Sequence, residues 1–74
     1  FKTHLLDLTE PLSVDVKSKD SFMIVICLEG LGKLKDSEGN VVALKQGETV
    51  LVPAVTDEIT FIPQSQLKVL TSWI

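Results

Sequence analysis

The side chains that could take part in chemistry are few and lie far apart in the sequence. His4 is the single histidine and Cys27 the single cysteine. General acid–base catalysis needs a positioned partner and a zinc site needs several ligands, so we expect His4 to be a packed or rim residue. Cys27 lies within the most apolar run of the chain, where burial would raise the pKa of its thiol and keep it unreactive. Neither residue predicts a catalytic centre.

Two charged pairs are candidate sites. Asp57 and Glu58 are adjacent, so in an extended strand they would point to opposite faces, and a solvated loop is the simpler interpretation. Lys33 and Lys35 alternate and would share one face, where a phosphate could lie between them. The favoured interpretation is a charged outer face of a hairpin that protects a sheet edge. With no Ser-His-Asp, Cys-His or phosphate-binding loop pattern, the residues predict no catalytic, cofactor-binding or metal-binding position.

The composition argues against several classes of partner. The chain has ten acidic and seven basic residues and a net charge of -3, and every basic residue is a lysine. Nucleic-acid binding needs a clustered basic face, and phosphate-binding enzymes commonly use arginine, so both are disfavoured. No apolar run approaches the ~20 residues that cross a bilayer, and no charged leader precedes one. We expect a cytoplasmic protein that binds neither nucleic acid nor membrane.

Hydrophobic residues recur with period two in short stretches bounded by turn residues, which is typical of β-strands. In residues 12–17 the alternation is complete, with Leu12, Val14 and Val16 expected to face the core. Residues 22–28 are apolar throughout, which predicts a central strand covered on both faces. The interior is expected to be filled by apolar side chains from several strands: Val14, Ile24, Ile26, Val50, Val52 and Phe61.

Residues 32–44 are predicted to form a hairpin. Asp36 would open a type I turn, and Gly39 would take the left-handed conformation and be the residue least free to change. Further strands are expected at Thr49–Val52, ended by Pro53, at 58–62, ended by Pro63, and at 67–74, where Leu67, Val69 and Trp73 share one side. With Lys2–Leu8 this makes about eight short strands, a number typical of all-β barrels and jelly rolls.

The chain is expected to be one unit spanning residues 1–74, without repeat or linker. At 74 residues the burial of apolar surface barely offsets the entropy of ordering the chain, so support from a partner surface is expected. The first residue, Phe1, is not a methionine, which we interpret as a chain trimmed from something longer.

The stretches "LEGLGKL" and "LKQGETVLVPA" resemble the two core motifs of the cupin superfamily, and in particular the C-terminal jelly-roll domain of type I mannose-6-phosphate isomerases. In that family a strand, a Gly-x-Gly turn and a Gly-(x5)-Pro-Ala segment occur in this order. The resemblance covers residues 21–74 and includes the closing "LKVLTSWI". It implies an all-β, cupin-like jelly-roll barrel or sandwich, with residues 1–74 a degenerate cupin at the C-terminal end of a longer chain.

Metal-binding cupins carry His-x-His, a Glu and a final His, and this pattern falls on Lys17, Lys19, Met23 and Glu58 when counted from Gly30 and Pro53. Protonated lysine cannot bind a cation, and a thioether is a soft, weak ligand. The resemblance therefore implies a barrel with no metal or other cofactor of its own.

The resemblance also implies a function for the longer chain, the interconversion of mannose 6-phosphate and fructose 6-phosphate at a zinc site in its N-terminal part, with proton abstraction next to a zinc-polarised carbonyl. This barrel would be a non-catalytic companion whose partner is the N-terminal catalytic domain of the same chain. Whether Lys33, Lys35 or Glu58 reaches the neighbouring active site is left open.

Two other functions remain as alternatives. A small standalone cupin could bind a sugar or another small molecule at the mouth of its barrel without chemistry. The chain could also be an assembly module that dimerises through an exposed sheet edge beside Lys2–Leu8.

Overall fold

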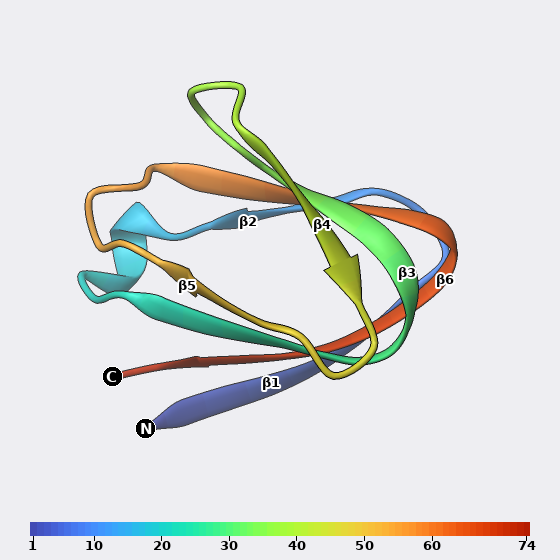
Figure 1. Cartoon of the computed structure of the whole chain (residues 1–74). Helices are drawn as coiled ribbons and strands as arrows, with labels where there is room; N and C mark the ends of the chain where they lie inside the picture. Colours follow the sequence, from blue (N-terminus) through green and yellow to red (C-terminus); the bar gives the residue numbers. More distant parts are fainter.

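The computed structural model describes all residues from Phe1 to Ile74, which form an antiparallel β-barrel (Figure 1). Its elements are β1 (Lys2–Leu8), β2 (Leu12–Asp15), the 3-10 helix η1 (Lys17–Lys19), β3 (Met23–Asp36), β4 (Val41–Lys45), β5 (Thr49–Val52) and β6 (Glu58–Trp73). The all-β, jelly-roll-like prediction is confirmed. No helix is long and apolar enough to cross a membrane.

Strands β3 and β6 organise the barrel because they pair with each other along most of their length and bend together (Figure 1). The first half of β3 and the second half of β6 are flanked by β5 and β1, whereas the other halves are flanked by β4 and β2. The sheet therefore folds over on itself, and its two halves enclose the core between them.

Six strands form instead of about eight, because two pairs of predicted strands are continuous. Residues 22–28 and the first arm of the hairpin both belong to β3, and residues 58–62 and 67–74 both belong to β6. The prediction that Pro63 ends a strand is wrong. Residues 62–66 of β6 pair with neither β1 nor β2, and the β3–β6 ladder is irregular between Gly30 and Gly32, so the missing N–H of proline is tolerated there.

Glycine is required where β3 bends against β6. Gly30 has φ of 89°, and a Cβ atom at this position would overlap the backbone carbonyl oxygen of Gln66. A Cβ on Gly32 would lie 2.7 Å from the Ile62 carbonyl oxygen. Gly39 also has a positive φ, of 91°, but no heavy atom lies within 4 Å of its Cβ position. The prediction that Gly39 is the least replaceable residue is therefore wrong, and Gly30 takes its place.

The turn between β3 and β4 forms as predicted around Asp36. One oxygen of its carboxylate accepts hydrogen bonds from the backbone N–H groups of Glu38 at 3.0 Å and Asn40 at 2.9 Å, and the other accepts one from Asn40 Nδ2 at 3.0 Å. These bonds, with the Asn40 side chain as the largest cause, lower the pKa of Asp36 below its usual value. Because the ionised carboxylate is the form that binds, the turn is stabilised above the ordinary pKa of aspartate, and this contribution is lost as pH falls through the lowered value.

Replacement of Asn40 by alanine should raise the pKa of Asp36 toward its usual value. The substitution removes the side-chain donor and keeps the backbone N–H bond, so the shift should be partial. An NMR titration of the Asp36 carboxyl carbon measures it, with Ser37→Ala as a control in the same turn. An unchanged midpoint in Asn40→Ala would show that the side-chain bond contributes nothing.

The core is a single cluster of apolar side chains contributed by both halves of the sheet. Its buried members are Val16, Met23, Val25, Cys27, Leu34, Leu44, Val52, Ile59, Phe61, Leu67, Val69 and Trp73. The predicted core positions Val52 and Phe61 are confirmed, and Val14 and Val50 pack against the cluster while partly buried.

The predicted orientation of residues 22–28 is wrong. Met23, Val25 and Cys27 are buried, whereas Ile24 and Ile26 lie on the opposite, partly exposed face. A run that is apolar at every position has no periodicity, so the inward face could not be read from it. The strand predicted at residues 12–17 is shorter than expected, because β2 ends at Asp15 and η1 follows. Leu12, expected to face the core, is 38% exposed.

Candidate functional site

The four positions of the metal pattern do not come together as ligands. Met23 is fully buried among apolar side chains, and Glu58 is exposed at the start of β6 opposite Asp15. Lys17 lies 3.7 Å from a carboxylate oxygen of Asp57, and Lys19 Nζ lies 4.3 Å from the centre of the Trp73 ring. No three His, Cys, Asp or Glu side chains are grouped anywhere in the structure. These residues do not fit a metal ion.

His4 and Cys27 occupy the positions that the sequence predicted. His4 is exposed on β1 and contacts Trp73 edge to face, with ring centres 4.8 Å apart. Cys27 is fully buried, and its thiol lies 3.7 Å from the Glu29 carbonyl oxygen. Burial, and secondarily the charge of Glu48, raises the pKa of Cys27 above its usual value. A buried thiol with a raised pKa is a poor nucleophile, so Cys27 is a packing residue.

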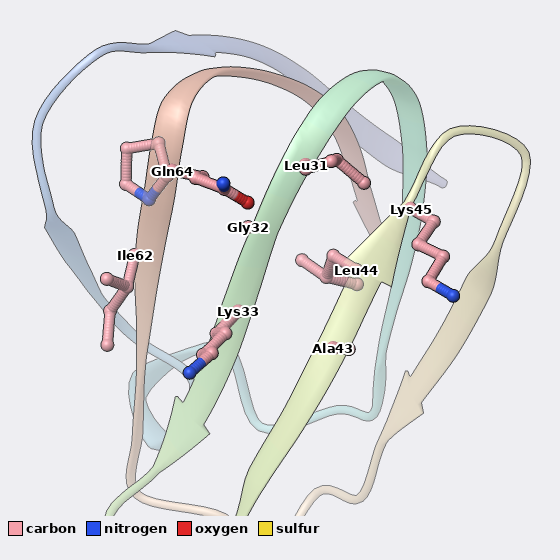
Figure 2. Close-up of a pocket in the computed structure, with 9 residues that line it drawn as sticks. Leu31, Gly32, Lys33, Ala43, Leu44, Lys45, Ile62 and Gln64 are labelled. Carbon is pink, nitrogen blue, oxygen red and sulfur yellow. The ribbon is translucent and has the colours of Figure 1, made fainter.

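The largest concave surface is a groove of about 540 Å³ formed by three strands (Figure 2). Its walls and floor are Leu31, Gly32 and Lys33 of β3, Ala43, Leu44 and Lys45 of β4, and Ile62, Pro63 and Gln64 of β6. Its volume lies within the range of about 300–1,000 Å³ that is typical of small-molecule sites. This surface, hereafter the β3–β4 groove, combines an apolar floor with a few polar side chains.

Two ammonium groups flank the floor of the β3–β4 groove. Lys33 pairs with Ala43 and Ile62, and Lys45 pairs with Leu31, so both lysines lie on the same face of the sheet. Figure 2 shows Lys33 on β3 and Lys45 on β4 with their side chains extending away from each other. The only ion pairs in the structure are those of Lys17 with Asp57 and of Lys68 with Glu29. The groove lysines are therefore free to meet an anion.

The structure confirms that Lys33 and Lys35 share a face, but it changes the second member of the candidate pair. Lys35 lies farther along β3, opposite Val41, and does not line the groove, whereas Lys45 does. Lys45 and Gln64 were missed by sequence reasoning. Lys45 could have been found from the register of the predicted hairpin, because this register places Lys45 opposite Leu31. Gln64 reaches the groove from β6 only because β6 continues through Pro63.

The other hollows in the structure offer much less space than the groove. One of about 100 Å³ lies between β4 and β5 and is lined by residues that include Val42, Val50 and Thr56, and one of about 190 Å³ lies beside Glu38 and Val55. Both volumes are below the range of ordinary ligand pockets. A ligand of sugar size would fit the β3–β4 groove better than either hollow.

Comparison with known proteins places this geometry in a family. The family model described as "Mannose-6-phosphate isomerase, cupin domain" matches residues 1–72. No curated protein matches the chain in sequence.

Several solved structures share the fold. A cupin-2 domain containing protein from Shewanella frigidimarina has a TM-score of 0.75 and 16% identity, over 93% of this chain and 65% of that one. A "putative mannosephosphate isomerase" from Archaeoglobus fulgidus has a TM-score of 0.81 and 22% identity, over 96% of this chain and 22% of that one. The plu4264 protein from Photorhabdus luminescens has a TM-score of 0.80 and 12% identity, over 96% of this chain and 59% of that one.

The chain thus spans less than two thirds of each of these three proteins. At these identities the structural matches show a shared cupin fold, and the family match extends over nearly the whole sequence. The chain belongs to the family of mannose-6-phosphate isomerase cupin domains.

Proposed function

We propose that this chain is the non-catalytic C-terminal cupin domain of a mannose-6-phosphate isomerase and supports a zinc-dependent catalytic domain in the N-terminal part of the same polypeptide. The observation that carries the proposal is the family match over residues 1–72, combined with an interior filled by apolar side chains where metal-binding cupins carry their ligands. In such a polypeptide this barrel contributes packing surface, and the isomerisation of the sugar phosphate takes place elsewhere. The cytoplasm is the proposed compartment.

Two features of the structure favour a supporting role over a catalytic one. Met23 fills the position of the metal-binding glutamate and is fully buried, so a change of one rotamer would not create a ligand. The two lysines at the His-x-His positions are already engaged, Lys17 with Asp57 and Lys19 with Trp73.

The proposal can be tested on the whole polypeptide, purified from its source cells. A tag at the C-terminus of the genomic copy allows the polypeptide that carries residues 1–74 to be purified, weighed by mass spectrometry and assayed for conversion of mannose 6-phosphate to fructose 6-phosphate. The expected result is a polypeptide several times heavier than 8.1 kDa with activity that a zinc chelator removes. An 8.1 kDa polypeptide without activity would overturn the proposal.

The isolated chain provides the complementary measurement. Purified residues 1–74 should show no isomerase activity with or without added zinc, and no stoichiometric zinc by elemental analysis after dialysis. A zinc-loaded isomerase serves as positive control in both assays. Zinc-dependent turnover by the 74 residues alone would contradict the non-catalytic assignment.

A second candidate function is supported by the β3–β4 groove, which could hold a small anion such as a sugar phosphate between Lys33 and Lys45. Amide shifts of Leu31, Ala43 and Gln64 during NMR titration with mannose 6-phosphate, but not with mannose, would favour this function. The double substitution of Lys33 and Lys45 by methionine should remove the shifts, whereas Lys2→Met, which is outside the groove, should leave them unchanged. Titrations without shifts at these residues would exclude it for this ligand.

A further inference from the structure

Strand β4 lies at an edge of the sheet, and part of its backbone has no strand to pair with. It pairs only with β3, and Figure 1 shows β4 and β5 diverging from the turn that joins them. The backbone N–H of Asp36 donates to the Asn40 carbonyl oxygen at 3.0 Å, which fixes the phase of an antiparallel ladder in which bonded and unbonded pairs alternate. Val41 and Ala43 fall in unbonded pairs. Their N–H and C=O groups therefore point to the free edge.

The interior is incompletely covered beside this edge. Val42 points inward, because it alternates with the buried Leu44 on β4 and pairs with the buried Leu34 on β3, yet it is 46% exposed. The hollow of about 100 Å³ between β4 and β5 is lined by Val42 and, on β5, by Val50 and Leu51. A cavity of about 150 Å³ holds a benzene ring, so this hollow can hold an aliphatic side chain. A strand added to β4 would cover Val42 and fill the hollow.

The outer side of the same edge is positively charged. Lys33, Lys35 and Lys45 point outward from β3 and β4, and none of them forms an ion pair. Their neighbours in the same rows of the sheet are uncharged: Leu31, Val41, Ala43, Thr60 and Ile62. A chain with a net charge of -3 thus presents three lysines here without a carboxylate between them.

We propose that the free edge of β4 binds an extended segment of a partner protein in which acidic residues alternate with aliphatic ones. The segment adds one strand to the sheet and forms hydrogen bonds with the backbone groups of Val41 and Ala43. Side chains of a strand point alternately to its two faces. The aliphatic residues of the segment therefore cover Val42, and its carboxylates lie on the side of the lysines.

The lysines argue against a second copy of this chain as the occupant. Two β4 strands paired edge to edge would place Lys33, Lys35 and Lys45 of both copies on one continuous face, where like charges repel. An acidic strand is attracted instead, because Lys45 lies on β4 itself and Lys33 is separated from the edge only by the small side chain of Ala43. This inference goes beyond the proposed function and does not rest on it, since every residue that it uses lies on β3, β4 or β5.

The available edge is short, so the expected affinity is low. At Lys45 the backbone N–H already donates to the Glu48 carboxylate at 2.9 Å, and the carbonyl oxygen accepts a bond from the Glu48 N–H at 3.0 Å. Val41 and Ala43 remain for the partner strand, and ordering an extended segment costs part of the binding energy. We expect a dissociation constant between about 10 μM and 1 mM that increases with ionic strength, because salt screens exposed charges.

NMR titration of the purified chain with a peptide of alternating glutamate and valine, about seven residues long and blocked at both ends, tests the proposal. The amide signals of Val41 and Ala43 should shift, and their hydrogens should exchange more slowly, because both groups gain bonds to the peptide. Two control peptides keep the same side chains. One groups the glutamates and the valines in separate blocks, and the other carries methyl groups on its backbone nitrogens. Neither control should shift these amides.

Substitutions in the chain test the charges and the backbone separately. Lys45→Glu should weaken binding of the alternating peptide about fivefold, whereas Lys2→Glu, which makes the same change in net charge on β1, should leave binding unchanged. Ala43→Pro removes the N–H that faces the edge and should abolish binding. Proline is accepted at such positions of edge strands, and a native-like NMR spectrum verifies the fold. Should Ala43→Pro not fold, the methylated peptide tests the same bonds.

Four results would overturn the proposal. Equal binding of the block peptide or the methylated peptide would show that carboxylates bind the β3–β4 groove without adding a strand. Shifts confined to amides of β1 or β2 would place the added strand at another edge. Shifts of Val41 that depend on protein concentration without peptide would make a second copy the occupant. Unchanged Val41 and Ala43 amides at about 1 mM alternating peptide would show that the edge of β4 does not bind such a segment.

Discussion

Gly30→Ala is expected to destabilise the chain more than any other substitution proposed for it. The new Cβ would overlap the backbone carbonyl oxygen of Gln66, and a backbone atom in a paired strand cannot move aside as a flexible side chain can. The positive φ of 89° adds a penalty of about 1–2 kcal/mol for any L-residue with a side chain. A domain of this length has a total stability of about 4–11 kcal/mol, and we expect a loss of more than ~4 kcal/mol from the combined overlap and strain.

Far-ultraviolet circular dichroism and urea denaturation measure the effect, with Gly39→Ala as the matched control. Gly39 has nearly the same φ, 91°, but open space at the Cβ position, so its replacement isolates the conformational penalty of about 1–2 kcal/mol. Equal losses in the two variants would show that β6 can shift at the bend. In that case the close approach of β3 and β6 would not be what makes glycine necessary at position 30.

The contrast between these two glycines shows where sequence reasoning succeeds. The turn at Asp36 and Gly39 is local, because the five consecutive residues 36–40 and their hydrogen bonds determine it, and it was predicted correctly. The need for Gly30 depends on Gln66, which is distant in the sequence and lies close only after β6 bends across β3. No local pattern contains that information.

The same reason explains the errors in strand number and orientation. Alternating stretches such as Leu67, Val69 and Trp73 reveal their inward face, and all three are buried as predicted. Residues 22–28 carry no alternation, so the choice between Ile24 and Val25 as the core residue is made by pairing with β5 and β6. Pro63 could be accommodated in β6 only because no strand pairs on its far side, which is a property of the assembled sheet.

Only part of the candidate site could be predicted from the sequence. Lys33 could be placed on an outward face from the hairpin pattern alone, but the β3–β4 groove also needs Lys45 and Gln64, which come from two other strands. The family, in contrast, could be recognised, because the glycines and the proline that carry its motifs keep the spacing that the bends and turns of this fold require.

Phe61→Ala is expected to have the second-largest effect. Phe61 is fully buried, pairs with Leu34 on β3 and Leu12 on β2, and is the largest of the fully buried side chains. Replacement of a buried phenylalanine by alanine costs about 3–5 kcal/mol through lost burial and the cavity that remains. Since this approaches the stability of the whole domain, the variant should be largely unfolded at 37 °C.

Thermal denaturation of Phe61→Ala beside Ile62→Ala provides the measurement. Ile62 is adjacent but lies on the opposite face of β6 and is half-buried in the groove, so its truncation should cost at most about half as much. A loss below about 1.5 kcal/mol in Phe61→Ala would mean that the interior is loosely packed, because a tightly packed core cannot lose an aromatic ring at so little cost. An interior of that kind could admit a ligand, and the alternative of a binding barrel would then be favoured over a purely supporting one.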